Sequence, residues 1–135
     1  MREIEVAAAL VFRDGRLLIT KRHADAHLGG LWEFPGGKRE PGEAFDVCLK
    51  RELREELGIE VAIGELLENL THEYSDRIVH LRFYRCRWTQ YEPQLLDCAD
   101  FKWVRLDDLK NFEFPAADAQ LLQRLRNSPD LWAER

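Results

Sequence analysis

An acidic helix that follows a glycine-containing loop is the feature that most constrains this chain. Residues 37–59 read GKREPGEAFDVCLKRELREELGI. Pro41 and Gly42 are unfavourable inside a helix, so residues 36–42 are expected to form a loop. No Gly or Pro interrupts residues 44–57, and Gly58 is a typical C-cap. The pattern therefore predicts a helix of about four turns directly after the loop.

The predicted helix has an apolar stripe and an acidic face. The stripe repeats in i, i+4 steps through Phe45, Leu49, Leu53 and Leu57. Glu52, Glu55 and Glu56 lie one turn from one another on an adjoining face, where their charges repel. Solvent with Arg51 and Arg54 as intrahelical partners would relieve this repulsion, and so would a divalent cation such as Mg²⁺ or Mn²⁺. The loop favours the cation, because bare backbone and a helix N-terminus suit phosphate.

This segment resembles the Nudix box of the Nudix hydrolases, enzymes that split nucleoside diphosphates linked to another moiety. It fills every position of the pattern G-x5-E-x7-R-E-U-x-E-E-x-G-U, in which U is a bulky aliphatic residue. Such a match arises by chance roughly once in a billion start points. The resemblance implies an α+β fold, an α/β/α sandwich around a mixed central sheet. We expect residues 1–135 to form a single Nudix hydrolase domain.

The resemblance also implies metal-assisted hydrolysis of a phosphoanhydride, with Mg²⁺ as cofactor and Mn²⁺ as a substitute. The implied metal ligands are Glu52, Glu55, Glu56 and the carbonyl oxygen of Gly36. Glu52 and Glu55 are also candidates for catalysis, and Arg51 is expected to orient Glu52 through a charge-assisted hydrogen bond. For Glu43 at the helix start there are two interpretations, a helix cap or a secondary cation contact, and we favour the cap.

More specifically, residues 5–125 resemble the MutT branch, which converts nucleoside triphosphates to the monophosphate and pyrophosphate. Asp97 lies six residues before Trp103, where the family carries a further carboxylate that binds metal or activates water. The competing interpretation of Asp97 is an acid on a surface loop. The substrate-binding residues that the resemblance implies are Arg22 and His27 for the triphosphate and Phe34, Arg77 and Asp118 for the nucleobase.

Asp118 departs from the MutT pattern for oxidised guanine, which has Asn at this position. An ionised Asp only accepts hydrogen bonds, whereas Asn both donates and accepts. Asp118 therefore favours a base edge rich in N–H donors, such as the amino group of cytosine, the N1–H and N2–H₂ edge of guanine or the N7–H of 8-oxoguanine. The O6 atom of guanine would then need another donor, either Arg77 or a backbone N–H. A helix acid that meets no base is the remaining alternative.

Composition limits the partners of this chain. It has 135 residues, of which 45% are hydrophobic and 33% charged, an ordinary mix for a folded domain. A net charge of −5 argues against binding a nucleic acid polymer, and it argues for cations between an acidic site and a polyphosphate. Without a long apolar run or signal segment, we expect a cytoplasmic protein that binds no membrane. The three cysteines are expected to be reduced and structural.

The remaining elements follow from hydrophobic alternation and turn signals. We expect strands over residues 3–13, 16–21, 32–35, 59–63, 66–74, 78–88 and 101–106. Asp14 and Gly15 predict a type I′ hairpin, and Gly64 is expected to end a strand. Pro115 is expected at the first position of a terminal helix, and residues 128–135 are expected to fray.

We therefore expect a Mg²⁺-dependent (deoxy)nucleoside triphosphate pyrophosphohydrolase that removes oxidised nucleotides such as 8-oxo-dGTP before they damage DNA. The enzymatic alternative is a CTP or modified-dCTP pyrophosphohydrolase. A non-catalytic nucleotide-binding or sensor module is less favoured, because the box keeps all its carboxylates. ADP-ribose hydrolases are disfavoured, because the proline they carry after the box is missing between Pro41 and Pro93. The expected assembly is a monomer or weak homodimer.

Overall fold

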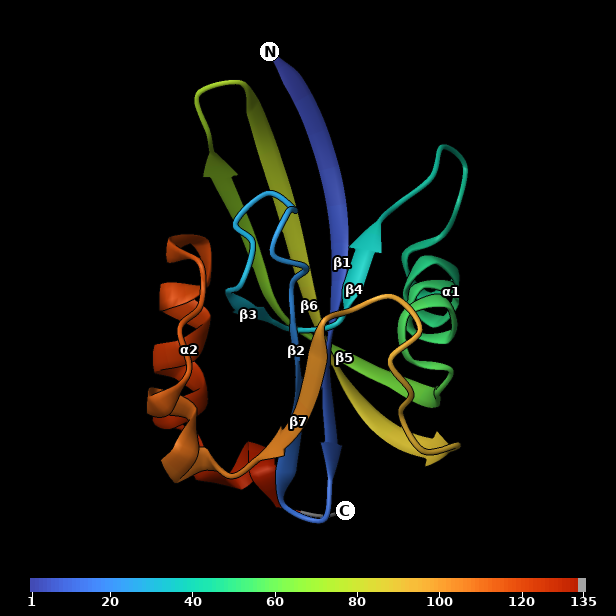
Figure 1. Cartoon of the computed structure of the whole chain (residues 1–135), viewed down its shortest axis with the longest axis vertical. Helices are drawn as coiled ribbons and strands as arrows, with labels where there is room; N and C mark the ends of the chain where they lie inside the picture. Colours follow the sequence, from blue (N-terminus) through green and yellow to red (C-terminus); the bar gives the residue numbers. More distant parts are fainter. Residues whose placement is uncertain (134–135) are drawn as a thin grey trace.

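Seven strands form one mixed sheet in the computed structural model, which describes residues 1–133 (Figure 1). The strands are β1 (Arg2–Arg13), β2 (Arg16–Lys21), β3 (Trp32–Glu33), β4 (Gly36–Lys38), β5 (Glu60–Glu73), β6 (Arg77–Gln90) and β7 (Asp100–Val104). The helices are α1 (Phe45–Leu57) and α2 (Ala119–Arg126), with 3₁₀ turns η1 (Leu106–Asn111), η2 (Ala116–Asp118) and η3 (Pro129–Trp132). The sheet order is β3-β2-β1-β6-β5, with β4 added to β1 and β7 to β2. Among the strands of residues 1–133, only β1 and β6 pair in parallel.

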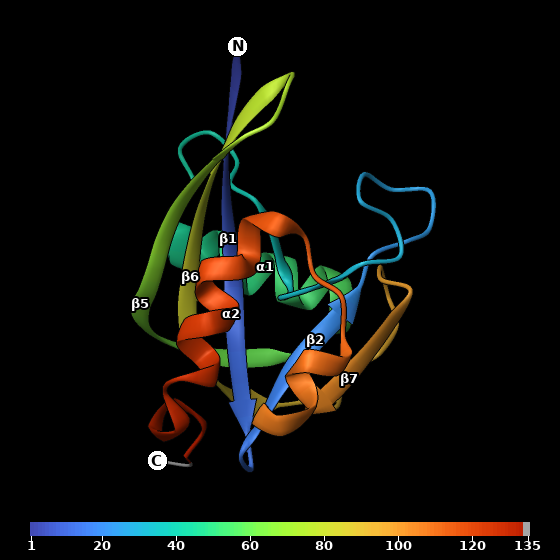
Figure 2. The same ribbon diagram turned by 90° about the vertical axis from the view of Figure 1, so that its left-hand side faces the viewer.

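The alternation along β1 buries both faces of the sheet. Ala8, Leu10 and Phe12 belong to the core under α2. The residues between them, Ala7, Ala9 and Val11, belong to the core under α1. Figure 2 shows α2 in front of the sheet and α1 behind it. The predicted α+β class and α/β/α layering are confirmed, because each face of the central strand needs an apolar cover.

The predicted helix forms within one residue of its expected bounds. α1 begins after Ala44, and Gly58 ends it with φ 67°, where its N–H donates to the carbonyl oxygen of Arg54 at 3.0 Å. The leucines of the stripe are fully buried. Phe45 at the start of the stripe is only partly covered, between the guanidinium groups of Arg39 and Arg82.

The loop predicted over residues 36–42 is wrong in its first half, because Gly36–Lys38 is strand β4. Gly36 pairs with Ala8 and Gly37 with Ala7 on the central strand. A Cβ atom on Gly36 would overlap the carbonyl oxygen of Ala7 and lie 2.8 Å from Ala8 Cα. The absence of a side chain at Gly36 therefore allows β4 to lie close against β1. In the sequence, a glycine that serves this purpose looks the same as a glycine in a flexible loop.

Gly64 does not end a strand as predicted, because β5 continues through it. The pairing with β6 shifts register between Ile63 and Leu66, which marks a bulge around Gly64. A Cβ atom at Gly64 would lie 2.9 Å from the carbonyl oxygen of Arg85. The Asp14–Gly15 hairpin is confirmed, with φ of 52° and 74° at the two residues.

Two predictions for the C-terminal region need correction. Pro115 precedes the 3₁₀ turn η2, and α2 begins four residues later at Ala119. Residues 128–133 do not fray, because η3 places Trp132 in the core with 5% of its surface exposed. Its ring packs edge-on against Phe12 at 5.4 Å, and Nε1 donates to the carbonyl oxygen of Leu125 at 3.1 Å. The rest of the predicted fraying segment lies outside the described residues.

Trp132→Phe should lower the free energy of unfolding by about 1–2 kcal/mol, because it removes the indole hydrogen bond and leaves part of the pocket empty. Chemical denaturation measures this change. Leu95→Ala is the control, since Leu95 is exposed and should change stability by less than about 0.5 kcal/mol. Equal stability of Trp132→Phe and wild type would mean that η3 contributes nothing to the core.

The three cysteines are free and buried, as expected. Burial raises the pKa of each thiol, which leaves them protonated and unreactive near neutral pH. Within the described residues, no helix combines the length and apolar character needed to span a membrane.

Candidate active site

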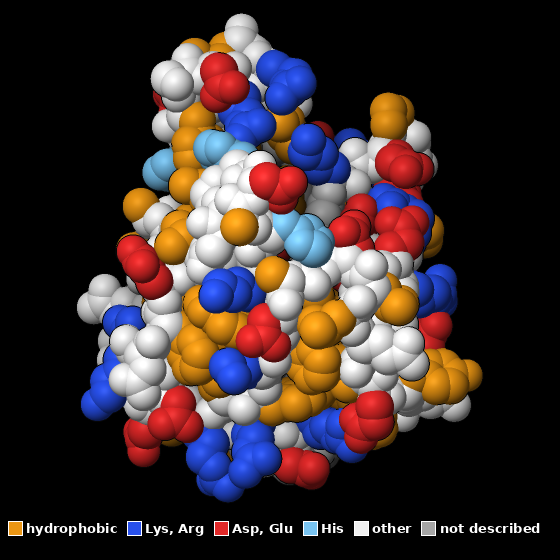
Figure 3. All heavy atoms as spheres, in the orientation of Figure 1, with side chains coloured by type: hydrophobic (Ala, Val, Ile, Leu, Met, Phe, Trp, Pro, Cys, Tyr) orange, Lys and Arg blue, Asp and Glu red, His pale blue; other side chains and the backbone are white. Residues whose placement is uncertain are grey.

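A cavity of about 560 Å³ opens where β4, α1, the loop after β2 and the start of the C-terminal region meet. Its floor is apolar and comes from β1 and β6, through Val6, Ala8, Leu81 and Phe83. In Figure 3, acidic, basic and histidine side chains gather around a hollow in the upper half of the face. The cavity thus joins an apolar surface to two sets of opposite charge.

The cavity brings together most of the site residues predicted from the sequence. Its lining includes Arg22, His27, Phe34, Gly36, Glu52, Glu56, Arg77, Asp97 and Asp118. Glu55 and Arg51 are the predicted residues that do not line it. Glu55 is exposed on the next turn of α1, and Arg51 lies behind Glu52.

Arg51 holds several carboxylates at the start of the acidic face. Its Nη1 donates to Glu52 Oε1 at 3.0 Å, which is the predicted orienting contact, and also reaches Glu55 Oε2 at 3.3 Å. Its Nε and Nη2 bind both oxygens of Glu43 at 2.7 and 3.0 Å. This pairing lowers the pKa of Glu43 to about 2. The helix-cap interpretation of Glu43 is therefore wrong: Ala44 is the N-cap, and Glu43 neutralises Arg51 instead.

Glu56 and Glu52 form the acidic wall of the cavity. Glu56 is only 8% exposed, and burial together with the charges of Glu33 and Glu52 raises its pKa to about 9. Burial also raises the pKa of Glu52, whose carboxylate lies against the backbone of Gly37. Glu56 is thus buried beside other acids, whereas Glu52 also pairs with Arg51, and hard divalent cations favour carboxylate oxygens as ligands.

The donor set therefore fits a divalent cation of the Mg²⁺ type. The oxygens of Glu52 and Glu56 and the backbone of Gly36 face the same cavity. In residues 1–133, however, no three His, Cys, Asp or Glu side chains converge in a preformed ligand arrangement. Water and substrate phosphates ordinarily complete the coordination of Mg²⁺, so a full protein cage is not required.

Asp97 lies at the edge of this wall. Its backbone N–H donates to the carbonyl oxygen of Glu56 at 3.1 Å, and His23 Nε2 contacts its Oδ1 at 3.2 Å. The Asp97 side chain is 74% exposed, as the surface-loop interpretation expected. It nevertheless lines the cavity, and its charge contributes to the raised pKa of Glu56.

The basic residues on the opposite side are engaged with the protein itself. Arg22 donates to Glu33 Oε1 at 2.7 Å and to the carbonyl oxygen of His27 at 2.6 Å. The His27 ring packs edge-on against Tyr74, with 5.4 Å between the ring centroids. Arg77 lies over Tyr74, and its buried Nε has no hydrogen-bond partner among the described residues. Arg77 lines the cavity, and the same Nε lies 3.9 Å from Asp76 Oδ1.

Phe34 and Asp118 lie at the apolar end of the cavity. Phe34 stacks on Phe114 at 5.1 Å and is buried, so most of its ring belongs to the core. Burial, with the charge of Glu33, raises the pKa of Asp118 to about 7. The expectation of an Asp118 that only accepts is therefore incomplete, because a protonated fraction near neutral pH also donates.

Asp118→Asn should change how stability depends on pH. Between pH 5 and 7 the folded protein keeps a proton on Asp118 that the unfolded chain has released, since the ordinary pKa is 3.8. The free energy of unfolding of the wild type should therefore fall by about 2 kcal/mol over this range relative to Asp118→Asn, and level off above pH 7. Chemical denaturation at four pH values measures the difference. If the free energies of unfolding of the two proteins changed in parallel with pH, the pKa of Asp118 would not be raised in the folded state.

Sequence reasoning missed Glu33, which faces the cavity from β3. Burial raises the pKa of Glu33, and its charge raises those of both Glu56 and Asp118. The charge of Glu33 therefore acts on residues at both ends of the cavity, Glu56 in the acidic wall and Asp118 at the apolar end. The signal in the sequence is an acid between Trp32 and Phe34, two large apolar residues expected in a short strand.

Comparison with known proteins agrees with this architecture. A family model described as NUDIX domain matches residues 6–124. The chain is 39% identical to the CTP pyrophosphohydrolase of Escherichia coli (strain K12), over 91% of each protein. It is 33% identical to the 8-oxo-dGTP diphosphatase of the same strain, over 93% of this chain and 98% of that one. The solution structure of the E. coli ORF135 protein superposes with a TM-score of 0.80 at 37% identity, covering 95% of this chain and 91% of that chain.

The chain belongs to the Nudix family, as its box over residues 37–59 indicates. Within the family it is a MutT-like Nudix hydrolase, which confirms the enzyme class and the fold expected from the sequence. Nudix hydrolases generally need a divalent metal ion, in agreement with the oxygen ligands on the acidic wall.

Proposed function

We propose that this protein is a Mg²⁺-dependent (deoxy)nucleoside triphosphate pyrophosphohydrolase, which converts NTP and water to NMP and pyrophosphate. One observation carries the proposal: the carboxylates of Glu52 and Glu56, the latter buried beside other acids, line the same cavity as Asp118 and Arg77. A cation at the acidic end would attract polyphosphate, and the apolar end would accept a base. We propose that residues 1–135 act as one domain, in the cytoplasm, as a monomer or weak homodimer.

The residues of the acidic wall would hold the cation. Glu52, Glu56 and the Gly36 carbonyl would supply ligands from the cavity, and Glu55 and Asp97 would be further candidates. When bound, Mg²⁺ supplies neutralisation of phosphate charge and lowers the pKa of water. Arg51 keeps the Glu52 carboxylate oriented through their hydrogen bond.

The other end of the cavity would bind the substrate. Arg22 and His27 line the cavity and would contact the triphosphate. Arg22 also donates a hydrogen bond to the carbonyl oxygen of His27, which stabilises the loop that carries both residues. Asp118 and Arg77 would pair with the base edge, and Phe34 would contact its face. An Asp118 that titrates near pH 7 can offer either a donor or an acceptor, so it suits more than one base.

We propose oxidised purine nucleotides such as 8-oxo-dGTP as substrates, whose hydrolysis would keep damaged bases out of DNA. Cytosine nucleotides are the second candidate. That alternative is supported by the acid at position 118 and by the 39% identity to a protein named CTP pyrophosphohydrolase. Hydrolysis at the acidic wall would be the same for both kinds of nucleotide. They would differ only in the contacts that the base makes with Asp118, Arg77 and Phe34.

A nucleotide panel tests the proposal. Pyrophosphate release is measured for 8-oxo-dGTP, dGTP, CTP, dCTP and 5-substituted dCTP, with ADP-ribose as a control that should not be hydrolysed. We expect kcat/KM to be highest for 8-oxo-dGTP, with activity abolished by a chelator and restored by Mg²⁺ or Mn²⁺. A large preference for cytosine nucleotides would reject the guanine assignment. Hydrolysis unaffected by chelation would reject the metal mechanism.

A further inference from the structure

The residues that follow β2 and the residues that precede β7 remain side by side beyond the end of the β2–β7 ladder. The last pair of that antiparallel ladder joins Lys21 to Asp100. One step further, the N–H of Ala99 donates to the carbonyl oxygen of Lys21 at 2.9 Å. Because antiparallel segments advance in opposite directions, this register brings His23 next to Asp97 at the cavity rim.

The backbone of Asp97 is fixed, but its side chain is largely in solvent. The N–H groups of Leu96 and Asp97 both donate to the carbonyl oxygen of Glu56, each at 3.1 Å, and Gln94 N–H donates to that of Leu57 at 2.9 Å. These bonds attach the loop to the end of α1. An exposed carboxylate on a fixed backbone still samples several rotamers. Its direction therefore depends on contacts of the side chain.

His23 provides such a contact. Its Nε2 lies 3.2 Å from Asp97 Oδ1, and both residues line the cavity together with Glu52 and Glu56. A carboxylate oxygen accepts hydrogen bonds, so Nε2 carries the hydrogen of this pair.

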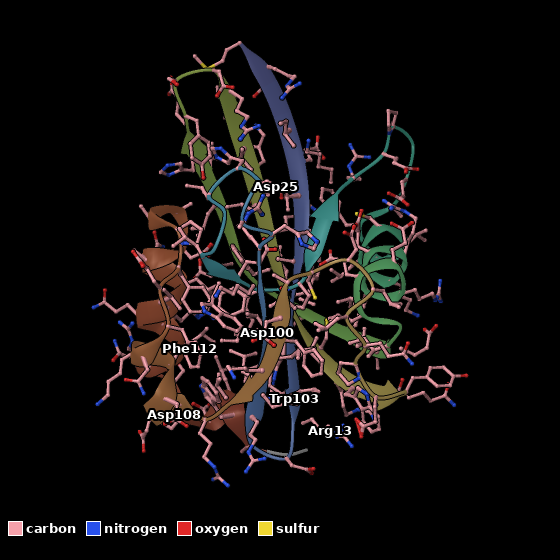
Figure 4. The ribbon with its side chains drawn as sticks, in the orientation of Figure 1. Arg13, Asp25, Asp100, Trp103, Asp108 and Phe112 are labelled. Carbon is pink, nitrogen blue, oxygen red and sulfur yellow. The ribbon has the colours of Figure 1, made fainter. Side chains whose placement is uncertain are left out.

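The backbone under the imidazole is tightly organised. The carbonyl oxygen of His23 accepts the N–H of Ala26 at 3.1 Å. Arg22 closes the base of the loop, with its N–H donating to Leu31 and its carbonyl accepting from Gly30. In Figure 4, Asp25 of this loop lies in the upper half of the view, far from Trp103 and Arg13 near the lower end. Backbone hydrogen bonds therefore hold the segment that carries the His23 imidazole.

We propose that His23 is a positioning residue for hydrolysis: its Nε2–H holds the Asp97 carboxylate over the cavity, facing the acidic wall. This inference rests on the proposed function, in which Asp97 serves as a metal ligand or activates water. A different role, direct binding of His23 to the substrate phosphates, predicts a change in KM rather than in kcat. The experiment below distinguishes the two roles.

A double-mutant cycle tests the proposal. His23→Ala should lower kcat by roughly 10- to 100-fold with little change in KM, because the carboxylate loses its orientation. In an Asp97→Ala background, His23→Ala should cause no further loss. His23→Gln, whose amide also donates, should recover part of kcat. His80→Ala is the matched control, because His80 pairs with Glu3 at 2.9 Å outside the cavity, and it should keep wild-type kinetics.

Nuclear magnetic resonance of the histidine ring nitrogens supplies a readout that is independent of turnover. In the protein without nucleotide or metal, His23 should carry its hydrogen on Nε2, and Asp97→Ala should shift this tautomer preference. The signals of His80 should not move in the same variant. An unchanged His23 signal in Asp97→Ala would overturn the hydrogen bond on which the proposal depends.

The kinetic outcomes separate the possible failures. A loss that persists in the Asp97→Ala background and appears in KM would overturn positioning in favour of direct phosphate binding. Full activity of Asp97→Ala would overturn this inference alone and leave the proposed hydrolysis intact. A wild-type protein that hydrolyses no nucleotide in the panel would instead overturn the proposed function.

Discussion

Glu52→Gln is expected to lower kcat for nucleoside triphosphate hydrolysis by about 10³-fold, within the range that positioned acid–base groups contribute. The amide keeps the volume of the side chain but removes the charge that faces the cavity. It also disturbs the hydrogen bond from Arg51, which donates to Glu52 Oε1 at 3.0 Å. The measurement is pyrophosphate release at saturating nucleotide and Mg²⁺.

Stability and metal affinity should respond differently in this variant. Because burial raises the pKa of Glu52, replacing it with a neutral amide should not lower Tm. Affinity for Mn²⁺, measured without nucleotide, should fall. Glu60→Gln is the matched control, since Glu60 pairs with Arg54 at 2.5 Å outside the cavity and should leave kcat unchanged. Unaltered pyrophosphate release by Glu52→Gln would refute the catalytic role assigned to Glu52.

Gly36→Ala is expected to lower the free energy of unfolding by about 3–5 kcal/mol and Tm by roughly 10 °C or more. The new Cβ atom would overlap the carbonyl oxygen of Ala7 and lie 2.8 Å from Ala8 Cα. Both atoms belong to β1, which is paired with β6 along most of its length and has little freedom to move away. Thermal and chemical denaturation measure the loss.

Gly42→Ala is the control for this substitution. Gly42 also has a backbone that favours glycine, with φ 78°, but a Cβ atom there would meet nothing within 4 Å. The left-handed conformation alone should cost about 1 kcal/mol. Equal losses for the two variants would mean that the contact between β4 and β1 is looser than the structure indicates.

The sequence predicted local features well. Residues 44–57 form the expected helix because its apolar stripe, the absence of Gly and Pro and the C-cap at Gly58 all act within a few turns. The hairpin at Asp14 and Gly15 forms because two residues with positive φ suffice to specify it. Gly36 and Gly64 were misassigned for one shared reason: each glycine permits a close approach by another strand, and no local pattern reveals that strand.

The sequence by itself determined the acidic helix, the Nudix family and most of the charged residues that meet in the cavity. Only the tertiary structure decided their electrostatic state. Glu33, Glu56 and Asp118 come from three distant segments; burial raises the pKa of each, and the charge of Glu33 further raises those of the other two. Spacing along the chain cannot give such shifts, because desolvation and charge interactions depend on distances that long-range strand pairing and packing set.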